Sequence, residues 1–378
     1  MIQYSKHPLI IAAALLLAAT FSSLALAETH DAKARAWPSE EGVPVNQWYM
    51  RTTDAEGAKL RHYIAEYGTA VKPEQTVIVL HGGWGSEHSY LVPAIRPLAG
   101  SYRFVLYDQR GSLRTPADPE DISFAALVDD LEQLRQRLGI EKVTLMAHSM
   151  GNHLAYGYLR AHPERVAGLI LVGAVTPDRF GVEEPSFLDD VWPDFSKTDA
   201  EAIAERSRKW ETNYHDRSSA LMIEAGLVPA DWAKQHPPET DPDLTAIYKW
   251  TDQQKTMGWR IQFTAVNTYD GRNWRQMLGG QVFYNEDVAS AVLQDPKFDK
   301  AVAGFWPALK AFKGPVRVII GTDDYVDLGP TYWPRLVEAM PDARLDTIRN
   351  AGHSIWMDEP EAFTRALRSA LEDITTRR

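Results

Sequence analysis

The chain has 378 residues, which is long enough to bury a large core, and 44% hydrophobic against 24% charged residues is the balance of a globular protein. Its formal net charge is −11, so its electrostatic field repels polyanions and argues against a nucleic-acid partner. The chain contains no cysteine, which excludes disulfides, thiol catalysis and cysteine-ligated zinc.

Residues 1–27 have the pattern of an export signal. A weakly basic start at Lys6 precedes an apolar stretch over residues 9–26, and residues 25–27 read Ala-Leu-Ala, a small-x-small cleavage site. We therefore predict a signal peptide that is removed after Ala27, and a mature protein that is periplasmic or secreted and not drawn to membranes. The alternative is an uncleaved membrane anchor, for which the apolar stretch is near the short limit of a span.

The next elements alternate between strands and helices. Continuous apolar runs at 76–80 and 103–107 predict strands that are buried on both faces. A helix is expected between an N-cap at Ser123 and a stop at Gly139, because apolar residues recur there at helical spacing. The alternation continues with a strand, a helix and a strand at 143–146, 152–161 and 169–172. This pattern predicts the α/β class, with a mostly parallel, doubly wound sheet.

The regular alternation stops between residues 176 and 311. This segment contains amphipathic helical stretches and proline-rich breaks such as Gln235-His-Pro-Pro238. The strand pattern resumes at 316–320 and 344–348, and a helix at 363–371 closes the chain. We therefore expect a core made of residues 28–175 and 312–378, with a helical cap inserted at 176–311.

Ser149 is the candidate nucleophile. It is the centre of Ala147-His148-Ser149-Met150-Gly151, which lies between a predicted buried strand and a predicted helix, as a nucleophile elbow requires. The turn is so tight that the residues two before and two after the serine must be small. Alanine replaces the usual glycine at the first of these positions.

A glycine-rich loop, His81-Gly82-Gly83-Trp84-Gly85, follows the strand at 76–80. Such a loop supplies one half of an oxyanion hole, whose two backbone N–H groups stabilise the negative charge of a tetrahedral intermediate. We nominate the N–H groups of Gly83 and Met150, with Trp84 as the alternative to Gly83. The alternative interpretation of the loop is a plain tight turn, and His81 is expected to be a structural hydrogen-bonding residue.

The partners of the serine are expected later in the chain. Gly321-Thr322-Asp323-Asp324 ends the resumed strand, and His353 follows the last strand, so the order is serine, aspartate, histidine. His353 is the candidate general base, and one of the two aspartates would hold its ring in the correct tautomer. All three loops would lie at the carboxyl ends of parallel strands, which favours a single site.

These motifs resemble those of the α/β hydrolases, over residues 76–175 and 316–360. The His-Gly-Gly loop, together with Tyr107-Asp-Gln-Arg-Gly-Ser112, is similar to the proline iminopeptidase group, which also carries a helical cap inserted before the acid residue. Two departures concern the proline after His-Gly-Gly, which is Trp84 here, and the elbow around Ser149, which is of the esterase and lipase type. The resemblance implies the fold and the catalytic triad, but not the aminopeptidase activity.

The resemblance also implies roles for individual residues. It selects Asp324 over Asp323, because the family's acid lies three residues after the glycine that ends the strand. It pairs Trp210-Glu211 with a cap motif whose carboxylate binds the free amine of the substrate; the alternative for Glu211 is an ordinary surface glutamate. Trp84 and one or two of the many cap tryptophans are candidates to line an apolar pocket.

The sequence as a whole predicts a serine hydrolase that acts on a small-molecule or short-peptide substrate through an acyl-enzyme, without a cofactor or a metal. A nucleophilic aspartate is excluded because the elbow carries serine, and no phosphate-binding loop, dinucleotide fingerprint or metal-ligand spacing is present. An aminopeptidase similar to proline iminopeptidase is the preferred interpretation, with a carboxylesterase or lactone hydrolase as the alternative. A non-catalytic binding protein on a hydrolase scaffold is a remote third.

Overall fold

The computed structural model describes residues 36–40, 43–55, 57–69, 72–178, 187–235, 250–277 and 285–377. These residues form a nine-stranded sheet in the order β1-β2-β3-β5-β4-β6-β7-β8-β9. The strands are Ala36–Glu40, Val43–Thr53, Lys59–Tyr67, Thr76–Leu80, Arg103–Tyr107, Val143–His148, Val166–Val172, Val316–Gly321 and Ala343–Ile348, numbered β1 to β9 in that order. The six strands from β5 to β9 in the sheet order are parallel, which confirms the α/β prediction.

Three antiparallel strands at one edge of the sheet were not predicted from the sequence. β1, β2 and β3 form a meander, and β3 pairs with β5 in the antiparallel sense. Along β2 only every few residues are buried, because one face of this edge is exposed, so it lacks the continuous apolar run that marks a central strand. The predicted strands at 76–80 and 103–107, by contrast, are β4 and β5.

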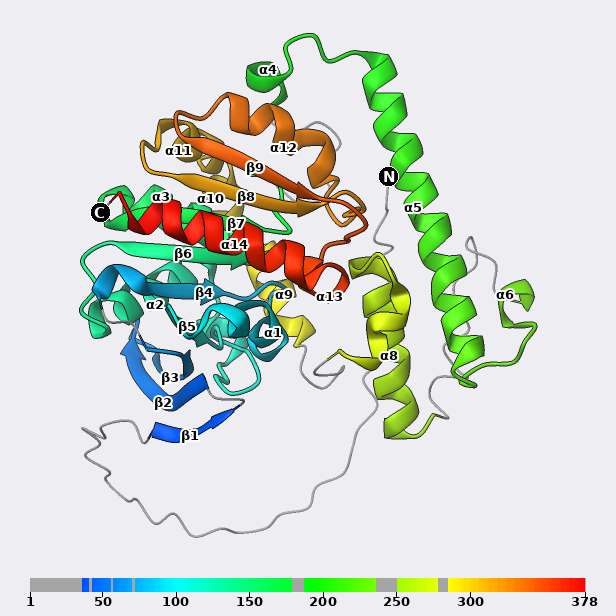
Figure 1. The fold of residues 1–378 in the computed structure, drawn as a ribbon, viewed down its shortest axis with the longest axis horizontal. Coiled ribbons are helices and arrows are strands. Elements are labelled where there is room, and N and C mark those ends of the chain that lie inside the picture. Colours follow the sequence, from blue (N-terminus) through cyan, green and yellow to red (C-terminus); the bar gives the residue numbers. More distant parts are fainter. Residues whose placement is uncertain are drawn as a thin grey trace.

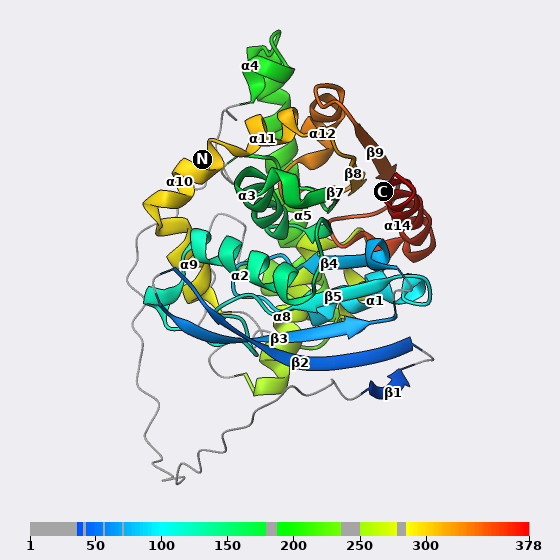
Figure 2. The same cartoon turned by 90° about the vertical axis from the view of Figure 1, so that its left-hand side faces the viewer.

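Helices cover both faces of the sheet (Figure 2). Helices α2 (Phe124–Arg137) and α3 (Gly151–Ala161) lie on one face, and α1 (Val92–Ile95) and α14 (Pro360–Thr375) lie on the other. The predicted cap at Ser123 is present, since its side chain accepts a hydrogen bond from the Ala126 N–H. The sheet is therefore doubly wound, as the strand–helix alternation predicted.

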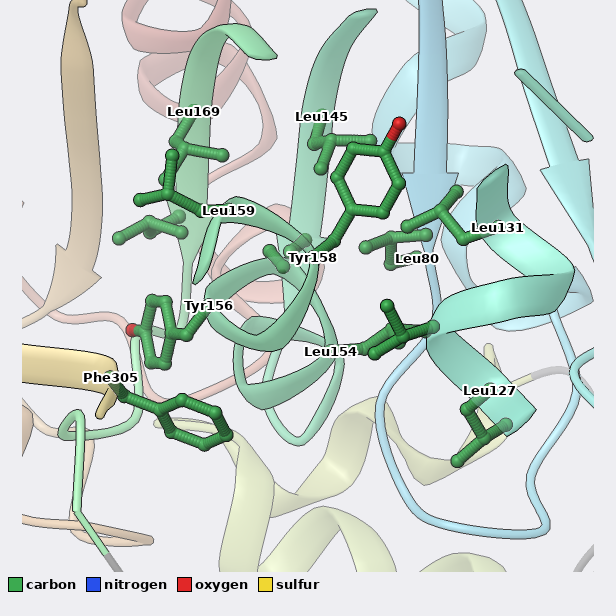
Figure 3. Close-up of a cluster of buried hydrophobic side chains, with 14 of the residues drawn as sticks. Leu80, Leu127, Leu131, Leu145, Leu154, Tyr156, Tyr158, Leu159, Leu169 and Phe305 are labelled. Carbon is green, nitrogen blue, oxygen red and sulfur yellow. The ribbon is translucent and has the colours of Figure 1, made fainter. Parts of the chain in front are cut away.

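Two hydrophobic cores lie on opposite faces of the sheet. Ile78 and Leu80 of β4 belong to one core, and Val77 and Val79 of the same strand belong to the other. The period-2 alternation of a strand produces this division. Figure 3 shows the first core, in which leucines of β4, β6 and β7 pack against side chains of α2, α3 and the later helix α11. These buried strands hold the loops at their carboxyl ends in fixed positions.

The segment after β7 is helical, as predicted. Its described helices are α4 (Leu188–Val191), α5 (Lys197–Glu224), α6 (Trp232–Gln235), α8 (Asp252–Asn267), α9 (Glu286–Gln294), α10 (Pro296–Val302) and α11 (Phe305–Ala311). Helices α5 and α8 lie beyond the carboxyl ends of the parallel strands (Figure 1). Between them is a small third core that includes Leu221, Trp232 and Ile261. The predicted proline-rich break at 235–238 lies mostly outside the described residues.

The last two helices of this segment pack differently. Helix α11 lies against α3, and α10 lies against α2 and α3, so Phe298 and Phe305 join the core of the sheet. The boundaries at 176 and 311 stay a prediction, and these contacts show that residues 296–311 belong to the helical layer over the sheet. An apolar helix face does not specify which partner covers it, so the sequence pattern does not indicate that residues 296–311 pack over the sheet.

After β8 the chain forms α12 (Gly329–Glu338), β9, the short α13 (Ile355–Asp358) and α14. The predicted helix at 363–371 lies within α14. No helix in the described part of the chain is both long enough and apolar enough to cross a membrane. The predicted signal segment, residues 1–27, lies outside the described residues.

Candidate active site

Ser149 occupies the sharp turn between β6 and α3. Its φ is +54°, in the left-handed region that residues other than glycine rarely adopt. The turn is held by hydrogen bonds: the Ser149 N–H donates to the Val172 carbonyl at 3.2 Å, and the Ser149 carbonyl accepts from the Asn152 N–H at 2.8 Å. Gly151 is needed because a Cβ there would lie 2.6 Å from the Leu80 carbonyl oxygen. Such an over-determined, strained backbone is typical of a functional residue.

His353 and Asp324 form a buried pair. Each residue is 2% exposed, and His353 Nδ1 lies 2.8 Å from Asp324 Oδ2. The second carboxylate oxygen accepts from the Val326 N–H at 3.1 Å, so the aspartate is fixed at both ends. Because the carboxylate accepts at Nδ1, that nitrogen carries the proton, and Nε2 is the free, basic nitrogen. Nε2 is buried and has no hydrogen-bond partner among the described residues.

The adjacent Asp323 lies in a different environment. It is partly exposed, and its carboxylate accepts a hydrogen bond from the Thr322 hydroxyl at 2.7 Å. No hydrogen bond or ion pair joins Asp323 to His353 among the described residues. The structure therefore pairs His353 with Asp324, the aspartate that the family resemblance selected.

The loops that carry these residues meet at the carboxyl end of the sheet. A Cβ placed on Gly173, just after β7, would lie 3.0 Å from His353 Nδ1 and 3.1 Å from His148 Nε2. The rings of His148 and His353 have centroids 4.7 Å apart. His353 therefore contacts the residue that directly precedes Ser149, which brings the elbow and the histidine loop together.

The glycine-rich loop lies directly on the elbow. A Cβ on Gly82 would lie 2.5 Å from the Ser149 Cβ, so only glycine fits there. Gly83 has a φ of +66°. Within the part of the chain that the structure describes, the N–H groups of Gly83 and Met150 have no acceptor. Both predicted donors, and also the N–H of Trp84, the alternative to Gly83, therefore lack an acceptor among the described residues, so the oxyanion hole at these groups stays a prediction.

The Asp108-Gln-Arg-Gly-Ser112 turn holds the glycine-rich loop in place through hydrogen bonds to His81. The Gln109 N–H donates to His81 Nε2 at 3.1 Å, and the Gln109 side-chain amide donates to the His81 carbonyl at 2.9 Å. His81 Nδ1 donates to the Gly82 carbonyl at 3.1 Å, and burial lowers the pKa of His81. His81 is thus a neutral, structural residue of the loop, as expected.

Arg110 anchors the same turn in the protein interior. Its guanidinium is fully buried and donates to both carboxylate oxygens of Asp130, at 2.7 and 2.9 Å, and to Asp54 at 2.9 Å. In the sequence, this arginine is marked only as part of a family motif. Its contacts fix the turn whose Gln109 holds the oxyanion loop, and no spacing rule in the sequence indicates its two carboxylate partners.

A buried acidic cluster lies beside this turn. Glu87, His88 and Asp108 place possible metal-ligating atoms within 4.8 Å of one another. His88 Nδ1 lies 2.6 Å from one Asp108 oxygen, and the Arg114 guanidinium lies 3.0 Å from Glu87 and 3.4 Å from Asp108. The carboxylates of the cluster are thus already paired with the Arg114 guanidinium and the His88 ring, and we assign no metal to the cluster.

Neither predicted substrate-binding side chain makes a hydrogen bond, ion pair or ring contact with the triad among the described residues. Trp84 is 3% exposed and packs edge-to-face against Phe124 and Phe298, so its side chain belongs to the hydrophobic core. A tryptophan that follows a strand end does not reveal from sequence which side it packs on. Glu211 is exposed on α5, which is the position of the ordinary surface glutamate that was its alternative.

Two further carboxylates near the site were not predicted from the sequence. Asp327 accepts hydrogen bonds from the Thr176 N–H and, at 2.7 Å, from the Thr176 hydroxyl, where the chain enters the helical segment. Asp358 accepts from the N–H groups of Gly352 at 2.9 Å and Tyr269 at 2.7 Å, which joins the histidine loop to the end of α8. Both hold loops around the site, and no motif in the sequence marks either residue.

The arrangement is chemically suited to acyl transfer. It combines a hydroxyl on a strained turn, an imidazole with a free Nε2, a carboxylate that orients this imidazole, and two unoccupied N–H donors. These groups come from four loops, the elbow supplying both Ser149 and the Met150 N–H, at the carboxyl end of the parallel sheet, where α/β folds place their sites.

Comparison with known proteins shows which family this chain is similar to. A family profile described as "alpha/beta hydrolase fold" matches residues 75–360. A putative carbamate hydrolase RutD of Caulobacter sp. (strain K31) is 25% identical over 81% of this chain and 93% of its own length. A probable proline iminopeptidase of Streptomyces coelicolor is 28% identical over 76% of this chain and 85% of its own. Other matches are partial: a RutD of Rhizobium rhizogenes is matched over 40% of its length.

Solved structures agree at the level of the fold. The proline iminopeptidase-related protein of Thermus thermophilus superposes with a TM-score of 0.53 at 22% identity, over 87% of this chain and 99% of that one. A thermophilic esterase of Thermogutta terrifontis gives 0.52 at 20% identity, over 87% and 99%. At such identities the likeness extends to the fold alone.

Proposed function

This chain belongs to the α/β-hydrolase family, and on that premise we propose that it is a serine hydrolase that cleaves small acyl substrates through an acyl-enzyme on Ser149. The observation that carries the proposal is the buried His353–Asp324 pair, with a free Nε2, beside the strained serine turn. An imidazole oriented by a carboxylate and left unpartnered at its basic nitrogen is what a hydroxyl nucleophile needs for activation.

The proposed reaction has two halves. His353 Nε2 takes the proton of Ser149 as its oxygen attacks the substrate carbonyl, and Asp324 stabilises the resulting imidazolium. The N–H groups of Gly83 and Met150 stabilise the oxyanion. His353 then protonates the leaving group as the bond to it breaks. In the second half, water gives a proton to His353 and attacks the acyl-enzyme. As the acyl–oxygen bond breaks, His353 passes this proton to the Ser149 oxygen, which releases the acid and regenerates the serine.

The central test is Ser149→Ala. We expect the turnover number to fall roughly 10⁴-fold or more, because the covalent route is lost while the binding groups remain. A fluorophosphonate probe should label the wild type and not the variant, as read by intact-protein mass spectrometry. A variant that stays within about tenfold of wild-type turnover would refute the role of Ser149 as the nucleophile.

For the substrate class we propose an aminopeptidase similar to proline iminopeptidase. The support is the His-Gly-Gly loop, the Asp-Gln-Arg-Gly-Ser turn and the relatives named proline iminopeptidase. The second candidate is a carboxylesterase or lactone hydrolase. Two observations favour it: the Ala-His-Ser-Met-Gly elbow is of the esterase type, and Glu211, the nominated amine ligand, is exposed on α5.

Paired substrates distinguish the two classes. If Glu211 binds the free amine, Glu211→Gln should lower kcat/KM for aminoacyl-arylamides roughly ten- to hundredfold and leave short-chain aryl esters unchanged, since a charge-assisted contact is lost. The matched control is Glu201→Gln, an exposed glutamate on the same helix. Equal effects on both substrate types, or a wild type that prefers N-blocked substrates, would replace the aminopeptidase with the esterase assignment.

A further inference from the structure

We propose that Tyr90 and His148 are positioning residues that join the oxyanion loop to the catalytic histidine through a directed chain of hydrogen bonds. The proposal rests on the proposed function of Ser149 and His353. It assigns a role to two residues that the triad does not include. His148 directly precedes the nucleophile, and Tyr90 lies in the short helical turn Ser89–Leu91 that follows the oxyanion loop.

The proposed chain of hydrogen bonds has three members. The Gly82 N–H donates to the Tyr90 hydroxyl oxygen at 2.7 Å. That hydroxyl lies 2.9 Å from His148 Nδ1. His148 Nε2 in turn lies 3.2 Å from the backbone carbonyl oxygen of His353. The chain therefore begins in the loop that carries the oxyanion donor Gly83 and ends on the main chain of the general base.

Donor and acceptor chemistry gives the chain a single direction. The His353 carbonyl can only accept, so His148 Nε2 must carry a proton. A neutral imidazole has one N–H, so His148 Nδ1 is an acceptor and the Tyr90 hydroxyl donates to it. The hydroxyl oxygen is then left to accept from the Gly82 N–H. Every group is satisfied in one arrangement, and reversing any bond leaves two donors or two acceptors facing each other.

The arrangement requires both residues to stay uncharged. Burial lowers the pKa of His148 well below its ordinary value, and the neighbouring His353 lowers it further. Burial raises the pKa of Tyr90, so its hydroxyl keeps the proton that it donates. A charged His148 would also place a second positive charge against the His353 imidazolium that forms during the reaction, across a ring-to-ring distance of 4.7 Å.

Packing makes this chain of hydrogen bonds rigid. The His148 ring lies against Trp356 at 4.9 Å and against Tyr90 at 5.6 Å, and it is 2% exposed. Gly82 fits between Ser149 and the Tyr90 hydroxyl, which would lie 3.1 Å from a Cβ on Gly82. The chain thus fixes the oxyanion loop and the base relative to the same nucleophile. Because displacements of about 1 Å in such groups strongly reduce rates, the chain affects catalysis although it does not touch the substrate.

The test uses Tyr90→Phe and His148→Phe, which remove the hydrogen bonds and keep the aromatic packing. We expect Tyr90→Phe to lower kcat and the rate of fluorophosphonate labelling roughly tenfold or more, with KM changed by less than about twofold. His148→Phe should cost at least as much, and the double variant no more than His148→Phe alone, because both act through one chain. His148→Gln, which keeps an amide donor for the His353 carbonyl, should recover part of the loss.

The matched control is Tyr158→Phe. Its hydroxyl also makes a hydrogen bond, at 2.6 Å to Glu132 between α2 and α3, and lies away from the site. This variant should keep the wild-type kcat and labelling rate. Wild-type kinetics in both Tyr90→Phe and His148→Phe, or losses that simply multiply in the double variant, would overturn the proposal.

A second measurement separates this inference from the proposed function. Nitrogen NMR of the imidazoles should find His148 as the neutral Nε2–H tautomer in the wild type and in Ser149→Ala. An Nδ1–H tautomer or an imidazolium at neutral pH would overturn the hydrogen-bond chain even in an active enzyme. If the wild type hydrolyses nothing and takes no probe, the proposed function fails, whereas the tautomer still decides whether the chain exists.

Discussion

Burial separates the two neighbouring aspartates that follow β8. Asp324 is 2% exposed and uses one oxygen for His353 and the other for the Val326 N–H. Asp323 is partly exposed and accepts from the Thr322 hydroxyl. A carboxylate orients an imidazole only if it accepts the hydrogen bond from Nδ1 and holds the ring in one position. Asp324 and Asp323 should therefore differ in their effect on catalysis, although they are chemically identical.

We therefore expect opposite outcomes from one conservative change at the two positions. Asp324→Asn should lower kcat by about three to four orders of magnitude, because an amide N–H facing Nδ1 favours the wrong tautomer of His353. Asp323→Asn, the matched control, should stay near the wild type. Steady-state kinetics of both variants is the measurement. The reverse ranking would transfer the role of acid to Asp323.

At the scale of elements, partly buried carboxylates fasten the loops after the strands to one another. Asp327 lies between β8 and α12 and binds Thr176, which follows β7. Burial raises the pKa of Asp327 to about 7. A group whose pKa is raised on folding stabilises the protein fully below its unfolded pKa, and this stabilisation is lost as the pH rises through the folded pKa.

For Asp327 that window runs from about pH 4 to about pH 7. Asp327→Asn keeps an oxygen that can accept from Thr176 but removes the titration. The melting temperature of the variant minus that of the wild type should therefore be several degrees larger at pH 8 than at pH 5, as measured by calorimetry.

Comparing the variant with the wild type removes the contribution of the buried histidines to the pH dependence of the melting temperature. The pKa of His153 is lowered to about 4 by burial, so its contribution to stability is lost as the pH falls from about 6.5 towards 4, in wild type and variant alike. Melting temperatures of the two proteins that change in parallel from pH 5 to pH 8 would show that Asp327 does not titrate in this range.

At the scale of the whole molecule, the chain consists of a negatively charged folded part preceded by the predicted export signal. We propose that the protein is exported and that the signal is cleaved after Ala27, from the basic start, the apolar stretch and the Ala-Leu-Ala site. Mass spectrometry of the protein from its native host should find Glu28 at the N-terminus, in a periplasmic or extracellular fraction. A chain that begins at Met1 in the membrane fraction would support the anchor instead.

Much of the core was predictable because buried parallel strands have a strong local signature. The runs at 76–80 and 103–107 have the bounds of β4 and β5, and the N-cap at Ser123 is the observed one. The motifs at Ser149, Asp324 and His353 follow directly from such strands, so their convergence at one edge of the sheet could be expected from the order of the elements.

Other features depended on partners that are distant in the sequence. The meander β1–β3 is a partly exposed edge without a continuous apolar run, and its pairing partner β5 follows much later. The last helices, α10 and α11, cover the core next to α2 and α3, which an amphipathic pattern does not specify. The core position of Trp84 and the exposure of Glu211 also depend on what surrounds them.

By itself, the sequence determined the α/β class, the central strands and the candidates Ser149 and His353, and it left the acid to one of two adjacent aspartates, of which the family resemblance selected Asp324. These properties are local: a buried strand, a tight turn and a glycine each impose requirements on a few consecutive residues. The tertiary structure alone decided the buried network of Arg110, the Asp327 and Asp358 contacts, and the chain from Gly82 through Tyr90 and His148 to His353. Each of these joins groups up to 205 positions apart, and the free energy of such a contact depends on burial that only the folded chain creates.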